Sequence, residues 1–99
     1  MTLHACALEV ELVLPGCRSL KDKRSRLRPI LDRVRHRYPV ALAEVDLQDD
    51  HQQAVLAFAA VSGTASMVTE QLDEIERLVW ASADVEVGAM HRHWLDTER

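Results

Sequence analysis

The sequence has few of the residues that mark secreted, metal-stabilised or membrane proteins. Its two cysteines, Cys6 and Cys17, fit neither a CxxC motif nor a structural zinc site. The stretch MTLHACALEVELVL has no basic start and is interrupted by Glu9 and Glu11, which argues against a signal peptide. No segment approaches the ~20 unbroken apolar residues of a membrane span. We therefore expect a cytoplasmic protein without a disulfide framework and without membrane contact.

Linker-forming residues are also scarce. The chain has three glycines and three prolines, and no low-complexity run interrupts its hydrophobic content of 47%. A chain of 99 residues is close to the commonest size of one domain and is long enough to bury a modest core. We predict a single globular domain over residues 1–99.

Positive charge is nearly absent outside one segment. The stretch RSLKDKRSRLRPILDRVRHR, residues 18–37, holds nine of the twelve Lys and Arg residues and two acids, which gives it a charge of +7. The rest of the chain has three basic and fourteen acidic residues, a charge of −11, so the net charge of −4 is the sum of two opposed parts. The sequence predicts one basic surface on an otherwise acidic protein.

Hydrophobic periodicity divides the chain into six elements. Alternating residues predict strands at 3–14, 40–47 and 84–95, and an apolar run predicts a central strand at 52–62. Residues spaced by three and four predict helices at 20–37 and from the cap candidates at 62–66 to about Ser82. The order βαββαβ, with right-handed crossovers, predicts an α+β ferredoxin-like sandwich, in which both helices lie on one face of a four-stranded antiparallel sheet.

The first predicted helix has a clear start and an irregular middle. Ser19 and Asp22 resemble a capping box, and Pro29 should remove one backbone hydrogen bond and kink the helix between Ser25 and Pro29.

The helix-free face of the sheet should be acidic. In strand 3–14, Glu9 and Glu11 lie opposite the apolar set Cys6, Leu8, Val10, Leu12 and Leu14. In strand 40–47, Glu44 and Asp46 should likewise lie opposite Ala41, Ala43, Val45 and Leu47.

Three blocks resemble a known family: RSLKDKR at 18–24, AEVDLQD at 43–49 and AVLAFAAVS at 54–62. In this order and spacing they are similar to the YlxP-like bacterial proteins, a family catalogued as a domain of unknown function (number five hundred and three). The resemblance covers nearly the whole chain and implies a ferredoxin-like fold. Members are typically encoded near translation and ribosome-maturation factors, which implies an association with RNA or the ribosome, and no catalytic residues come with the family. Pro29 departs from the family's usual uninterrupted helix.

The basic helix is the main candidate site. Helical geometry places Lys21, Arg24, Arg28 and Arg35 on one flank of the apolar stripe and Arg26, Arg33 and Arg37 on the other. Such side chains neutralise phosphates, so we predict a nucleic-acid interface. Its residues are Arg18, Lys21, Lys23, Arg24, Arg26, Arg28 and Arg35. The alternative is a solvated face balanced by the acidic second helix, which carries Glu70, Asp73, Glu74 and Glu76.

Two other places have weaker signals. The loop at residues 15–19 could hold an anion at the helix N-terminus, but an ordinary capped turn with Cys17 as an exposed thiol is favoured. His91 and His93 would hold a metal if they shared a face with Glu9 and Glu11. In a strand without a bulge, however, His91 and His93 lie on the same face as Val85, Val87 and Ala89, which is the face toward the helices. No metal site and no cofactor are therefore predicted.

Two functions that occur on this fold do not fit. RNA-recognition motifs stack bases on aromatic residues of the open sheet, whereas strand 52–62 offers only Phe58, and Trp80 and Trp94 are expected to pack in the core or at an interface. Acylphosphatases need an asparagine, and this sequence has none. We predict a non-enzymatic protein that binds RNA or the ribosome. The alternative is a homodimeric interaction module that uses the open sheet face, with the basic helix on an acidic protein.

Overall fold

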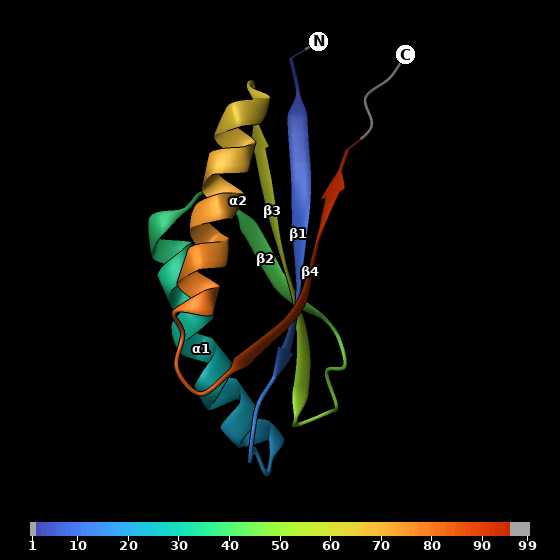
Figure 1. The fold of residues 1–99 in the computed structure, drawn as a ribbon, viewed down its shortest axis with the longest axis vertical. Helices are drawn as coiled ribbons and strands as arrows, with labels where there is room; N and C mark the ends of the chain where they lie inside the picture. The colour runs from blue at the N-terminus through green and yellow to red at the C-terminus, as the bar shows by residue number, and fades with distance from the viewer. Residues whose placement is uncertain (1, 96–99) are drawn as a thin grey trace.

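The predicted order of elements is confirmed by the computed structural model, which describes residues 2–95. The elements are β1 (His4–Val13), α1 (Leu20–Arg37), β2 (Ala41–Asp46), β3 (Gln53–Ser62), α2 (Ala65–Trp80) and β4 (Glu86–Trp94). Both helices cover the same face of the sheet (Figure 1), so the fold is α+β and ferredoxin-like. Within the described residues, neither helix combines the length and apolar character that crossing a bilayer requires.

The four strands are antiparallel in the order β2-β3-β1-β4. The central strands β1 and β3 pair over their whole length, from His4 opposite Ser62 to Val13 opposite Gln53. Their side chains toward the helices are buried, as in the pair of Leu8 with Phe58, each 0% exposed. Burial of Phe58 also removes the one aromatic of β3 from the open face, which leaves that strand no aromatic platform for bases.

Helix α1 has the predicted bounds, 20–37, because local chemistry sets its start. Ser19 is the N-cap, and its hydroxyl accepts a hydrogen bond from the Asp22 backbone N–H at 3.0 Å. The helix continues without interruption through Pro29. Ser25 and Pro29 both lie on an exposed face, so water can reach the Ser25 carbonyl that lacks a helical donor.

The faces predicted for β2 are wrong for Glu44. Val40 and Leu42 pack against the core, while Ala41 and Ala43 are exposed. Side chains alternate along a strand, so Glu44 shares the face of Leu42 and points toward α1. Leu42, the largest apolar side chain of the strand, was the better guide to its orientation.

The parity predicted for β4 is confirmed for Val85 and Val87, which pack against the core, but it is wrong beyond them, because the strand contains a bulge. Val10 pairs with Met90 but Leu12 pairs with Val87, so Glu11 faces both Gly88 and Ala89. Residues beyond the bulge therefore change face. Met90 packs against the core in the place expected for Ala89, and His91 and His93 lie on the open face.

Candidate nucleic-acid interface

The buried stripe of α1 consists of Leu27, Ile30, Val34 and one cation, Lys23. The prediction that Lys23 contacts phosphate is wrong, because its side chain is inside the protein and the residue is 1% exposed. Its Nζ lies 2.8 Å from the Leu47 carbonyl oxygen, 2.6 Å from that of Asp50 and 2.6 Å from Glu44 Oε2. These acceptors compensate the cost of burying an ammonium. Lys23 thus fixes α1 to the connection between β2 and β3.

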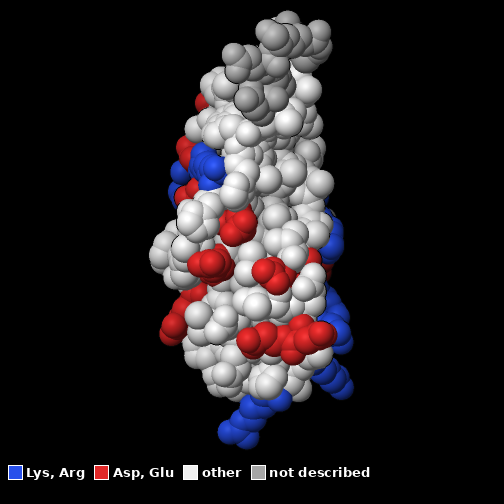
Figure 2. Space-filling view, turned by 90° about the vertical axis from the view of Figure 1, so that its right-hand side faces the viewer, with Lys and Arg blue, Asp and Glu red and all other residues white. Residues whose placement is uncertain are grey.

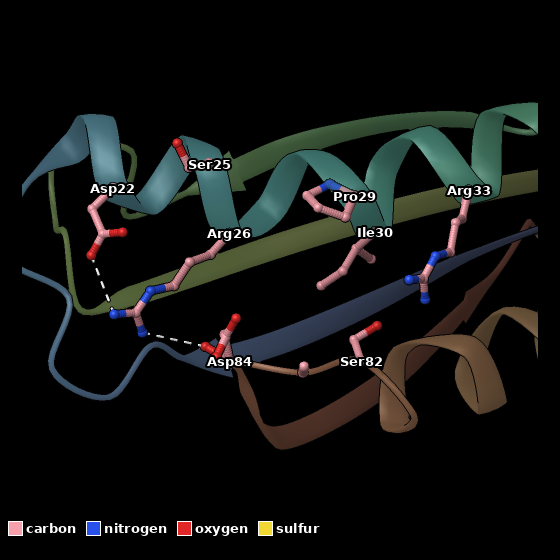
Figure 3. A pocket seen from close by; sticks show the side chains of 9 residues that line it. Asp22, Ser25, Arg26, Pro29, Ile30, Arg33, Ser82 and Asp84 are labelled. Atoms are coloured by element: carbon pink, nitrogen blue, oxygen red, sulfur yellow. Dashed lines mark hydrogen bonds and ion pairs between the residues drawn. The ribbon is translucent and has the colours of Figure 1, made fainter.

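Arg26 is also largely occupied by the protein itself. Its guanidinium donates to the Pro15 carbonyl at 2.6 Å, to the Asp84 carbonyl at 3.4 Å and to Asp22 Oδ2 at 3.2 Å. Its side chain is 20% exposed. Figure 3 shows it spanning from α1 toward Asp84, along a groove of about 520 Å³. Arg26 therefore links three segments and has little capacity left for an external phosphate.

The acid beside Arg26 is held in its charged form. The Cys17 thiol and then the charge and hydrogen bond of Arg26 lower the pKa of Asp22 below its usual range. Cys17 is 0% exposed, and its sulfur lies 3.5 Å from the Ser19 carbonyl oxygen. The prediction of an exposed Cys17 thiol is therefore wrong. The loop is a capped turn as favoured, with Gly16 at a φ of 69°.

Four of the predicted contact residues remain open to solvent. Arg18, Lys21, Arg24 and Arg28 are exposed, and none of them has an ion pair with any residue in the range 2–95. Arg35 is paired with Asp32 at 3.2 Å, but the two side chains are 57% and 50% exposed. An ion pair this exposed contributes little and exchanges readily for another anion. These five residues, Arg18, Lys21, Arg24, Arg28 and Arg35, are called the basic flank below.

Part of the basic flank lines a shallow groove. Arg24, Arg28 and Arg35 surround a depression of about 210 Å³ whose other walls include Leu27, Leu31 and Glu44. Glu44 is the one carboxylate among these lining residues, and the Lys23 ammonium compensates its charge. The groove therefore keeps a positive potential although a carboxylate is part of it.

The opposite flank of α1 has acidic neighbours. Arg33 and Arg37 are exposed and share a groove with Glu74 and Arg77, and Arg33 also lines the groove that contains Asp22 and Asp84. The sequence placed Arg33 and Arg37 on this flank without including them in the interface. Their surroundings favour the basic flank as the phosphate-binding side.

The acidic helix α2 does not neutralise α1 by direct pairing. Arg92 of β4 instead contacts Asp73 and Glu76, each at 2.6 Å, and the nearest polar link between the two helical segments is Tyr38 donating to Glu74 at 3.4 Å. Burial opposes the charge of Arg92, but its hydrogen bonds to Glu76 and Asp73 raise its pKa above the ordinary value. Within residues 2–95, no ion pair joins α2 to α1. This role of Arg92 was not predicted, since the bulge in β4 decides that Arg92 faces α2.

The open sheet face is an unfavourable surface for nucleic acid. Figure 2 shows this face with acidic side chains over its lower half, uncharged side chains above them, and Lys and Arg at its margins. Glu9 and Glu11 belong to it, and with His91 they offer ligand atoms within 4.8 Å of one another. A phosphate chain would be repelled here, so the basic flank is the better candidate.

Comparisons with known proteins cover most of the chain. Residues 5–92 match the model of a family described as "Protein of unknown function (DUF503)". The chain is also similar to the "Uncharacterized protein YlxP" of Bacillus subtilis (strain 168), with 28% identity over 86 residues. That alignment covers 87% of this chain and 94% of the relative.

Proposed function

We propose that this chain, which belongs to the DUF503 family of proteins of unknown function, is a non-enzymatic protein that binds the phosphate backbone of RNA, free or in the ribosome. The observation that carries the proposal is the basic flank. Its exposed cations lie along α1 and just before it, while three of the four acids of α2, Asp73, Glu74 and Glu76, are occupied by Arg92 of β4 and by Tyr38. A surface with this potential attracts a polyanion and releases its counterions on binding.

The composition of the basic flank suits phosphate groups. Four of its five members are arginines, whose planar guanidinium groups bind phosphate in a bidentate manner. Lys21, Arg24 and Arg28 follow one another at helical spacing, so they point to one side of α1. None of these contacts would distinguish bases, so we expect binding with weak sequence preference.

A mobility-shift assay with ribosomal RNA tests this function. The wild-type protein should shift the RNA at low salt, and charge reversal of Arg24 and Arg28 to glutamate should remove the shift. Arg77→Glu is the matched control for each single reversal, Arg24→Glu or Arg28→Glu, because Arg77 is an exposed arginine on the other helix. Equal loss with the Arg77 variant, or tight binding by the double variant, would contradict the assignment.

The second candidate function is a homodimeric interaction module. Among residues 2–95, one end of the open face has no Lys, Arg, Asp or Glu side chain around a shallow depression of about 270 Å³, whose lining includes Ala5, Ala7, Ala59, His93 and Leu95. Val61, in the strand next to Ala5, is 58% exposed. We propose that two copies pair through this area, which would leave the basic helix free for RNA or for an acidic protein.

Light scattering coupled to size exclusion tests the homodimer candidate. A dimer that Val61→Glu converts to a monomer would support pairing through the sheet. If the wild-type protein is a monomer at micromolar concentration, the homodimer proposal fails and the RNA proposal is unaffected.

A further inference from the structure

Two histidines and two glutamates meet on the open face of the sheet. Glu9 of β1 lies directly opposite His91 of β4, and Ala7 lies opposite His93. His93 Nε2 is 3.2 Å from Glu9 Oε1, and ligand atoms of Glu9, Glu11 and His91 lie within 4.8 Å of one another. This arrangement joins two carboxylates and two imidazoles from adjacent strands, and it differs from a simple acidic patch.

The bulge in β4 creates this arrangement. Without it, His91 and His93 would point toward the helices, whereas the extra residue opposite Glu11 turns them to the face of the glutamates. Gly88 allows the bulge to lie close to β1, since a Cβ at this position would be 3.3 Å from the Glu11 carbonyl oxygen and 3.5 Å from its Cβ. The geometry thus brings all four donors together on one side of the β1–β4 pair.

The charge of the two glutamates is not compensated by the protein's own cations. In residues 2–95, the single ion-pair partner of Glu9 is His93, and Glu11 has none. Figure 2 shows no Lys or Arg among the acids in the middle of this face. Two carboxylates on one strand face repel each other, and a cation between them and the imidazoles would relieve this repulsion.

We propose that Glu9, Glu11 and His91 bind a divalent transition-metal ion, with Zn²⁺ as the best-matched species and with His93, which contacts Glu9, as the fourth ligand. Imidazole nitrogen and carboxylate oxygen are ligands that Zn²⁺ takes in tetrahedral geometry, at roughly 2.0–2.2 Å. Four such ligands are separated by roughly 3.4 Å from one another in a tetrahedron of that size. The ligand atoms of Glu9, Glu11 and His91, within 4.8 Å of one another, are therefore near three of these positions, and His93 lies beside them through its contact with Glu9. Mg²⁺ and Ca²⁺ prefer all-oxygen sites and should bind more weakly.

Calorimetric titration of the chelator-treated protein, without a histidine tag, with zinc chloride at pH 7.5 tests the site. The expected result is one zinc ion per chain. His91→Ala and, separately, Glu11→Gln should each weaken binding at least tenfold. The matched controls are His51→Ala and Glu86→Gln, since both residues are exposed and lie outside the cluster; they should change the affinity less than twofold. All four positions are exposed, and a thermal melt of each variant verifies folding.

A spectroscopic measurement identifies the ligands independently of affinity. Addition of Zn²⁺ should shift the imidazole proton resonances of His91 and His93 in NMR spectra and leave those of His36 and His51 in place. The proposal is overturned if no zinc binds, if one ion binds per two chains, or if the His91 and Glu11 variants bind zinc as the wild type does. Because α1 takes no part in this site, loss of RNA binding by the Arg24 and Arg28 variants would not change the result.

Discussion

Replacing Arg24 and Arg28 by glutamine should change how strongly RNA binding depends on salt. Each phosphate neutralised by the protein contributes about −0.7 to the slope of log K against log salt for single-stranded nucleic acid. If the five residues of the basic flank each contact one phosphate, the slope is about −3.5, and between 50 and 200 mM salt the affinity falls about 130-fold. The double variant keeps three contacts, so its slope should be about −2.1 and its affinity should fall about 20-fold over the same range.

Fluorescence anisotropy with a labelled RNA oligonucleotide at four salt concentrations measures both slopes. The matched control is Arg33→Gln with Arg37→Gln, which removes the same charge from the other flank of α1 and should keep the slope near −3.5. Equal slopes for the wild type and the Arg24/Arg28 variant would refute the assignment of these arginines to phosphate. A smaller slope in the Arg33/Arg37 variant alone would place the interface on the opposite flank.

Three further predictions concern the charges inside the fold. Lys23→Ala should lower the free energy of unfolding in urea by about 3 kcal/mol or more, because it leaves Glu44 and two backbone carbonyls without their cation. A decrease in this free energy of less than about 1 kcal/mol would show that the ion pair is not needed for stability. Arg92→Gln should lower the free energy of unfolding by about 1–3 kcal/mol in the same assay, toward the lower end because solvent screens Asp73 and Glu76, whose side chains are 47% and 30% exposed. An unchanged urea midpoint would contradict this pairing. Because the pKa of Asp22 is lowered on folding, its carboxylate stabilises the protein above its ordinary pKa, and this contribution is lost as the pH falls through the folded value. Asp22→Asn should therefore lower the thermal midpoint at pH 7 and have a much smaller effect near pH 2. A difference in midpoint between the wild type and this variant that grows on acidification would contradict the prediction.

The fold was predictable because its signals are local. Three local signals define α1 over the bounds that the structure has. They are the N-cap Ser19, the helical spacing of the apolar residues Leu27, Ile30 and Val34, and the end of that spacing before Pro39. The alternation of β1 likewise predicted which side chains are buried. Such patterns depend on neighbours within a turn of helix or a few strand residues, so they can be recognised without tertiary information.

The orientation of single side chains was less predictable. The alternation of β4 could not reveal the bulge at Gly88, since one glycine in a strand has several explanations. That bulge decides that Arg92 faces α2 and that His91 and His93 face the glutamates. Glu44 was misplaced because charge was given more weight than the single leucine of its strand, Leu42.

The sequence by itself determined the order of the elements, the amphipathic α1 and the gathering of positive charge along it. Tertiary structure alone decided which of those charges remain available. Lys23 and Arg26 carry the same formal charge as Arg24 and Arg28, but backbone carbonyls of distant loops, at Leu47, Asp50 and Pro15, accept their hydrogen bonds. A carbonyl acceptor has no sequence signature, because every residue has one, so its partner becomes known only when the chain has folded around it.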